Sequence, residues 1–197
     1  MKSSRGITLK LSLAVIVGVL AFGNASAQRA NKADAETDTT KTKQAQAVSK
    51  EVYERIQKAQ EMVEEKQYQP ALKLLNSLYN PDKLTEYEQA NVLNYIGFVY
   101  YNMDDVNNAI RTYERMLAIP TLEPQMAKQT TYTMAQLLTM EEQYSKALTT
   151  LNKWFTLESN PAPEPFILKA QLVYNLNRYK EMVAPIESAM RIANERG

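Results

Sequence analysis

Three pairs of adjacent carboxylates are the residues of this sequence whose type and spacing come closest to an acid–base site. The pairs are Glu64-Glu65, Asp104-Asp105 and Glu141-Glu142. Two carboxylates can act as acid and base in glycoside hydrolysis when they flank the same bond. Side chains of adjacent residues in a turn do not converge on one substrate, however, and all three pairs fall at the turn predicted between paired helices. We therefore interpret them as solvated turn residues.

The residue types that other catalytic and metal sites need are absent. The 197 residues include no histidine and no cysteine. These absences exclude Ser-His-Asp and Cys-His nucleophilic sites, thiolate zinc sites and acid–base catalysis by histidine. The five glycines are scattered and form no phosphate-binding loop. The sequence therefore predicts a protein that is not an enzyme, with no catalytic residue, no metal site and no cofactor.

The acidic pairs lie between predicted helices that are themselves paired. Leu93, Ile96 and Tyr100 fall at positions i, i+3 and i+7, on one face of a helix. Gly97 is the small residue of this helix, and Ala109 is its counterpart in the helix that follows. Small residues at both positions let two helices approach closely. The segment is therefore predicted to be a helical hairpin.

This hairpin occurs four times along the chain. The small residue of the predicted first helix recurs at spacings of 38, 38 and 35 residues, as Ala59, Gly97, Ala135 and Ala170. The counterpart in the second helix recurs at the same spacings, as Ala71, Ala109, Ala147 and Met182. Each hairpin has more apolar surface than it can bury alone, so repeats of this kind stack and share a continuous core.

These residue types and offsets resemble the tetratricopeptide repeat (TPR), whose period is about 34 residues. The resemblance covers residues 49–197. It implies an all-α fold, a right-handed superhelix (an α-solenoid) of about four antiparallel helix pairs. The expected repeats are about 52–89, 90–127, 128–162 and 163–197.

Residues 1–27 have the features of a cleavable signal peptide. A basic start (Lys2, Arg5, Lys10) precedes an apolar run from Leu11 to Phe22 and a small-residue cleavage site, Ala25-Ser26-Ala27. The apolar run is shorter than the roughly 20 residues of a spanning helix, although an uncleaved anchor is the alternative. We expect a disordered polar linker over residues 28–48, localisation in the periplasm, and no membrane insertion after cleavage.

The charge balance gives no reason to expect nucleic acid as a partner. The chain has 23 basic and 22 acidic residues. Without the three basic residues of the predicted signal, 20 basic residues stand against 22 acidic ones, a net charge of −2. No run of lysine and arginine is present to contact a phosphate backbone.

The TPR resemblance also implies a protein or peptide partner in a concave groove lined by the first helices. The predicted groove residues are Asn91, Asn94, Phe98, Tyr101, Asn102, Tyr132, Gln136, Gln171, Tyr174 and Asn175, and Gln129, Met140 and Ile167 occupy further outward positions. Amide side chains can donate to and accept from a peptide backbone. Aromatic side chains add contact area at low entropy cost. The alternative for Phe98, Tyr101 and Tyr174 is packing against neighbouring helices.

The fourth repeat departs from the pattern. Lys169 replaces an apolar residue, Met182 replaces alanine, and Pro185 falls inside the predicted second helix. An interior proline costs about 3 kcal/mol unless the helix bends, so we expect a kink near Met182–Pro185. No further polar helix follows, which predicts an uncapped apolar end that pairs with a second copy or is covered by more of the chain.

A narrower resemblance suggests a cellular role. The run YTMAQLLTMEEQYSKALTTLNKWF, followed by NPAPE and RIANERG, is similar to exported TPR proteins found alongside TonB–ExbB–ExbD systems of Gram-negative bacteria. The resemblance implies a periplasmic scaffold that is accessory to TonB-dependent energy transduction and uptake, with a TonB-type periplasmic protein as partner. The alternative is a self-associating TPR scaffold in cell-envelope or outer-membrane assembly.

Overall fold

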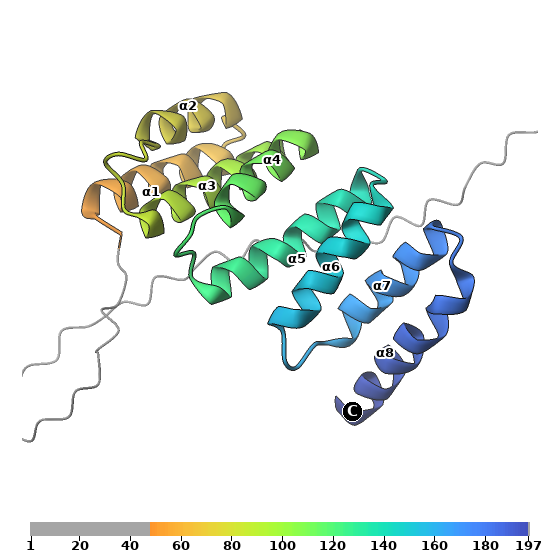
Figure 1. Ribbon diagram of the computed structural model, residues 1–197. Helices are drawn as coiled ribbons and strands as arrows, with labels where there is room; N and C mark the ends of the chain where they lie inside the picture. Colours follow the sequence, from red (N-terminus) through yellow and green to blue (C-terminus); the bar gives the residue numbers. More distant parts are fainter. Residues whose placement is uncertain (1–47, 197) are drawn as a thin grey trace, which may run out of the picture.

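The computed structural model describes residues 48–196, and this part of the chain is α-helical (Figure 1). Its helices are α1 (Lys50–Glu64), α2 (Tyr68–Leu78), α3 (Glu86–Asn102), α4 (Val106–Leu117), α5 (Pro124–Met140), α6 (Tyr144–Leu157), α7 (Pro163–Asn175), the short 3₁₀ helix η1 (Tyr179–Met182) and α8 (Val183–Arg196). The predicted signal peptide and all but the last residue of the predicted linker lie outside the described residues.

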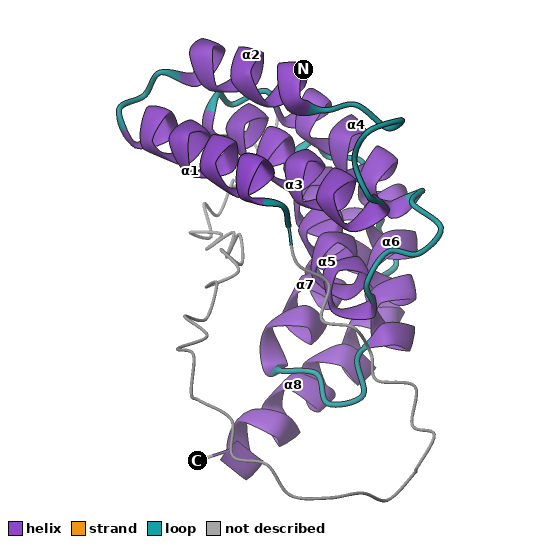
Figure 2. Cartoon of the chain, turned by 90° about the vertical axis from the view of Figure 1, so that its left-hand side faces the viewer, coloured by secondary structure: helices purple, strands orange, loops and turns teal. Residues whose placement is uncertain are grey.

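The helices pack as four antiparallel pairs, α1–α2, α3–α4, α5–α6 and α7–α8. Successive pairs are joined through contacts of α2 with α3, α4 with α5, and α6 with α7. Figure 2 shows the resulting arch, with α1, α3, α5 and α7 nearer its inner side than α2, α4 and α6. The prediction of an all-α fold built from antiparallel helix pairs is confirmed, and the handedness of the superhelix stays a prediction.

Two clusters of buried side chains form the core, and α3 contributes to both. Val92, Ile96 and Val99 of α3 pack with the apolar faces of α1 and α2. Ala90 and Leu93, also on α3, pack with residues of α4 to α7. An α-helix that is apolar on two sides is one buried between neighbours, which explains why α3 lacks a wide polar face.

Each first helix ends in the same hydrogen-bonded turn. The residue after the C-cap has a positive φ in all four pairs: Lys66 (60°), Asp104 (58°), Glu142 (55°) and Asn177 (58°). In the third pair the Gln143 N–H donates to the Leu138 carbonyl (2.9 Å) and the Glu142 N–H donates to the Thr139 carbonyl (3.1 Å). This is the Schellman motif, in which the left-handed position is usually glycine. The turn therefore occurs once in each helix pair, after the first helix, and none of the four turns has glycine at the left-handed position.

Replacing Glu142 by glycine is expected to stabilise the protein by about 0.5–1 kcal/mol, because a side chain in the left-handed region costs about 1–2 kcal/mol and glycine avoids this cost. The Glu142 side chain is exposed, so little contact is lost. Urea denaturation would measure the change. Lys153→Gly, at an exposed position inside α6, is the matched control and should destabilise the protein by about 0.5–1 kcal/mol. A loss of stability in Glu142→Gly would contradict the prediction.

The local signals at helix starts lie where the sequence places them. Thr85 and Glu88 have the T-x-x-E spacing of a capping box, and they form one at the start of α3. Asp105 caps α4 by accepting a hydrogen bond from the Asn108 N–H at 3.1 Å. Pro70 and Pro124 fall in the first turns of α2 and α5, where a missing N–H removes no intrahelical bond.

The start of α8 differs from the prediction. The chain forms η1 up to Met182, and α8 begins at Val183, so Pro185 lies in the first turn of α8. The helix is interrupted near Met182, as expected, but by a 3₁₀ turn and not by a kink at an interior proline. Pro185 needs no N–H there, because the first turn of a helix has no acceptor for it.

Candidate protein-binding face

The predicted groove residues lie on α3, α5 and α7. We use the term first-helix face for the outward positions of these helices that are at least partly exposed: Asn94, Phe98, Tyr101, Asn102, Gln129, Tyr132, Met140, Ile167, Gln171, Tyr174 and Asn175. α4 and α6 bridge the successive first helices α3, α5 and α7. The spacing of the three helices that form the first-helix face is therefore determined by their packing against α4 and α6.

Two of the predicted residues do not belong to this face. Asn91 is 1% exposed and Gln136 is 9% exposed. The Asn91 Nδ2 donates to the Tyr87 carbonyl of the preceding turn at 2.8 Å, so this amide is satisfied inside its own helix. α3 packs against α1, α2 and α4, which covers more of its surface than the repeat pattern predicts. The prediction that Asn91 and Gln136 line an exposed groove is corrected accordingly.

The α3 part of the first-helix face is only partly available. Asn102 Nδ2 donates to the Phe98 carbonyl at 2.8 Å, which leaves the Asn102 Oδ1 atom as an acceptor. Phe98 packs against the core cluster of the first two helix pairs. Tyr101 packs against the larger cluster that runs from α3 to α7. Packing, the alternative considered for these two aromatic residues, is therefore observed for a large part of each side chain.

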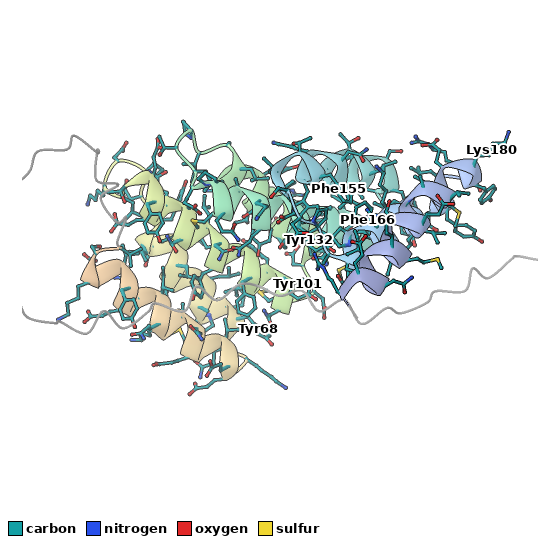
Figure 3. The ribbon with its side chains drawn as sticks, turned by 90° about the horizontal axis from the view of Figure 1, so that it is seen from below. Tyr68, Tyr101, Tyr132, Phe155, Phe166 and Lys180 are labelled. Carbon is teal, nitrogen blue, oxygen red and sulfur yellow. The ribbon has the colours of Figure 1, made fainter. Side chains whose placement is uncertain are left out.

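A row of aromatic rings links α5, α6 and α7 (Figure 3). The Tyr132 ring lies 4.9 Å from the Trp154 ring, Trp154 lies 5.2 Å from Phe155, and Phe155 lies 4.8 Å from Phe166. Contacts of this kind add about 0.5–1.5 kcal/mol beyond the apolar area they bury. Burial, with a smaller contribution from the Glu164 carboxylate, raises the pKa of Tyr132 to about 12. Tyr132 therefore presents a neutral hydroxyl and mainly positions α5 against α6.

The most exposed part of the first-helix face lies on α5 and α7. Met140, Ile167 and Tyr174 are 46%, 48% and 55% exposed. Ile167, Gln171 and Tyr174 are at i, i+4 and i+7 of α7, which places an amide between two apolar side chains in one row. The Tyr174 ring meets the Tyr179 ring edge-to-face, with the ring centres 5.5 Å apart, and about half of the Tyr174 side chain stays exposed. This row offers both contact area and hydrogen bonding.

Charged groups near this face are largely matched. Lys128 Nζ and Glu158 Oε2 form an ion pair at 2.8 Å. Hydrogen bonding from Lys128, together with the Asn160 N–H, holds the pKa of the Glu158 carboxyl below its usual value. Lys169 lies 5.4 Å from the centre of the Phe155 ring, a cation–π contact that accounts for lysine at this position. The face therefore has no strong field to select a charged ligand.

The acidic pairs lie at or directly after the ends of the first helices, and Glu64 is the last residue of α1. Asp105 caps α4, and Glu141 Oε2 accepts a hydrogen bond from Asn107 Nδ2 at 2.8 Å. Within residues 48–196, no group of three or more Asp, Glu, His or Cys side chains could hold a metal ion. In the same part of the chain, no helix is long and apolar enough to cross a membrane.

A second exposed apolar surface lies on α8, at the end of the array where the sequence predicts an uncapped apolar face, although the sequence analysis did not name its residues. Val183, Ile186 and Met190 are 57%, 40% and 61% exposed. Their spacing of i, i+3 and i+7 is the signal that could have revealed it. These residues follow one side of a regular helix, although the sequence predicts a kink near Pro185.

Comparison with known proteins agrees with this architecture. The family model of the anaphase-promoting complex (cyclosome) subunit 3 matches residues 102–189. The crystal structure of the nearly identical TPR-like repeats of a protein described as a kinesin light chain, from Podosopora anserina, matches with a TM-score of 0.60 at 16% identity, over 74% of this chain and 76% of that chain. The fold is TPR-like. At this identity the match shows the TPR-like fold alone.

Two further matches to TPR-like repeats are weaker. MamA MSR-1 is 12% identical over 75% of this chain and 99% of its own, with a TM-score of 0.36. MamA AMB-1 is 14% identical over 73% of this chain and 92% of its own, with a TM-score of 0.33. TM-scores of this size add nothing to the assignment of the fold. No curated protein matches the sequence.

Proposed function

We propose that this TPR-like protein is a non-enzymatic periplasmic scaffold that binds a protein partner through its first-helix face, as an accessory to TonB-dependent energy transduction and uptake. The observation that carries the proposal is the row Ile167, Gln171 and Tyr174 on α7, which exposes two large apolar side chains with an amide between them. TPR-like repeats act in general as platforms for protein partners, which agrees with such a row.

The chemistry of the row favours an uncharged, extended or helical peptide segment. An amide such as Gln171 can donate to and accept from a peptide backbone at the same time. Ile167 and Tyr174 would supply the apolar contacts that carry most of the energy of small interfaces. The periplasmic location rests on the signal-like features of residues 1–27, and the TonB role rests on the sequence resemblance.

Photo-crosslinking in the cell tests this function. A photoreactive amino acid at Ile167 is expected to crosslink to a TonB-type protein, because this side chain is about half exposed on α7. The matched control is Lys146, an exposed residue of α6 that does not belong to the first-helix face. Mass spectrometry of the crosslinked product would identify the partner.

Each outcome has a distinct meaning. A crosslink from Ile167 alone to a TonB-type protein supports both the face and the uptake role. A crosslink from Ile167 alone to a different envelope protein retains the face as a binding site and rejects the TonB role. Equal labelling from Ile167 and Lys146, or no labelling from either residue, means that the first-helix face is not where the protein binds.

A further inference from the structure

Among the residues that the structure describes, Gln136 of α5 is the one buried polar side chain that forms no hydrogen bond. The buried polar and charged side chains of residues 48–196 are Glu88, Asn91, Thr112, Thr130, Thr131 and Gln136. All of them except Gln136 have a hydrogen-bond partner. Leaving an amide unpaired in a protein interior is costly, so this residue requires an explanation.

The amide of Gln136 reaches solvent, although the residue is only 9% exposed. In residues 48–196, no fully enclosed side-chain nitrogen or oxygen lacks a hydrogen bond. Because the Gln136 amide has no such bond, both its nitrogen and its oxygen must reach the surface. The enclosed stem of this side chain therefore holds a free donor and a free acceptor in a fixed place.

The place of Gln136 on α5 is the floor of the first-helix face. Tyr132 and Met140, which belong to that face, lie four residues before and four residues after it. Residues four apart lie one above the other on the same side of a helix. The free amide thus lies between an aromatic and an apolar side chain, and Met140 is 46% exposed.

The equivalent residue of α7 is also an amide without a partner. Ala135 and Ala170 align in the repeats, so Gln136 aligns with Gln171, the central residue of the exposed row on α7. Gln171 is partly exposed and forms no hydrogen bond within residues 48–196. Two successive first helices therefore present free amides at equivalent positions.

We propose that Gln136 is a specificity-determining residue of the first-helix face and that it recognises the backbone of an extended partner segment. This inference rests on the proposed function. A partner that covered Gln136 without bonding to it would take the amide out of water with no replacement, which is costly. A peptide backbone supplies both the acceptor and the donor that the amide needs. Because the stem of Gln136 is already enclosed, little side-chain entropy is lost on binding.

The need for free backbone groups selects an extended segment over a helix. In an α-helix the backbone N–H and C=O groups bond to one another, except at the two ends. In an extended segment these groups point sideways along the whole length of the chain. Such a segment lying across α5 and α7 can bond to Gln136 and Gln171 at the same time. Its side chains then contact Ile167 and Tyr174.

Gln136→Met tests the role of the amide, because methionine keeps the length of the side chain and removes its donor and acceptor. The protein that carries a photoreactive amino acid at Ile167 is the probe. In this protein, Gln136→Met is expected to lower the yield of the crosslink to the captured partner at least tenfold. Gln125→Met is the matched control, since Gln125 is an exposed amide of α5 outside the first-helix face, and it should leave the yield unchanged.

The stability of Gln136→Met separates recognition from a structural role, and its measurement needs no partner. The urea midpoint of this variant is expected to equal or exceed that of the wild-type protein, because no intramolecular hydrogen bond is lost and an enclosed amide is replaced by an apolar group. A lower midpoint would show that the Gln136 amide stabilises the fold, and would overturn the proposal.

Ester substitution tests recognition of the backbone. The probe is a synthetic peptide with the sequence of the segment captured at Ile167, in which backbone amides are replaced by esters one at a time. At least one ester is expected to weaken binding to the wild-type protein at least fivefold, because an ester lacks the N–H donor. The same ester should leave binding to Gln136→Met unchanged, since the bond that it removes is already absent there. Fluorescence anisotropy measures both affinities, and a scan in which no ester behaves in this way would overturn the proposal.

The crosslinking experiment also distinguishes this inference from the proposed function. Equal capture by the wild-type protein and by Gln136→Met would reject the role of Gln136 and retain the first-helix face as the binding site. No capture from Ile167 in the wild-type protein would reject the proposed function, and the role of Gln136 with it.

Discussion

Gly97→Ala is expected to lower the free energy of unfolding by up to about 2 kcal/mol, although alanine is the better helix former. A Cβ atom at residue 97 would lie 2.7 Å from Cζ and 2.8 Å from Cε1 of Tyr113, well inside van der Waals contact. Tyr113 is 2% exposed, so its ring has no free space into which to move. Overpacking a core typically costs about 1–3 kcal/mol, which outweighs the gain of about 1 kcal/mol in helix propensity.

A double-mutant cycle identifies Tyr113 as the cause. In the first and third pairs the positions equivalent to Gly97 and Tyr113 hold Ala59 with Leu75, and Ala135 with Leu151. Tyr113→Leu combined with Gly97→Ala therefore creates in the second pair a combination that the chain already uses twice. In the Tyr113→Leu background, Gly97→Ala should be neutral or should stabilise the protein by up to about 1 kcal/mol.

Urea denaturation of the four proteins gives the coupling energy between the two positions. We expect a coupling of about 2 kcal/mol. An equal cost of Gly97→Ala in both backgrounds would mean that the clash with the ring is not the source of the penalty. Such a result would also remove the reason given for glycine in α3.

The sequence predicts those parts of the fold that depend on local rules. A small residue recurs at one position of each first helix, and this recurrence locates the four hairpins. It does so because two helices can approach closely only where the side chain between them is small. Thr85 with Glu88, and Pro124, mark the starts of α3 and α5 through bonds made within a single turn. Local signals do not predict the position of Pro185 correctly. Whether this proline lies inside a helix or in its first turn depends on where α8 begins, and the local sequence does not determine that.

The candidate site is predicted less completely, because exposure depends on how far apart the helices lie. Ile167, Gln171 and Tyr174 occupy the predicted outward row of α7. Asn91 and Gln136 have the same residue type and repeat position as true surface amides, yet both are buried. Their burial follows from how closely neighbouring helices pack, which the repeat pattern does not encode. The contact of Gly97 with Tyr113 is missed for the same reason.

Glu88→Gln is expected to lower the free energy of unfolding by about 2–3 kcal/mol at pH 7. Glu88 is 6% exposed and joins two helix starts that are far apart in sequence. Its Oε1 atom accepts from the Ser49 N–H at 2.9 Å, at the start of α1. Its Oε2 atom accepts from the Thr85 N–H at 3.0 Å and the Thr85 Oγ1 hydroxyl at 2.9 Å, at the start of α3. Glutamine has one acceptor oxygen and places an N–H₂ group against one of these donors.

The pKa of Glu88 gives this prediction a dependence on pH. Burial on its own would raise the pKa, but the hydrogen bonds from Ser49 and Thr85 outweigh it and lower the pKa of Glu88 from 4.5 to about 2. Since the pKa is lower in the folded state, the carboxylate stabilises the fold fully above about pH 4.5 and loses this effect as the pH falls towards 2. At 1.36 kcal/mol per pKa unit, the stabilisation at neutral pH is about 3 kcal/mol.

Urea denaturation of the wild-type protein and of Glu88→Gln at several values of pH separates this effect from a general loss of stability in acid. The difference between the two proteins should be largest at pH 7 and should narrow between pH 4.5 and pH 2, since only the wild-type protein has the carboxylate to protonate. Glu61→Gln, at an exposed position of α1, controls for the removal of a surface charge and should change stability by less than about 0.5 kcal/mol. A constant difference between the wild-type protein and Glu88→Gln across this range would show that the ionised carboxylate does not hold α1 to α3. The attachment of the first helix pair to α3 would then depend on apolar contacts such as those of Val92, Ile96 and Val99.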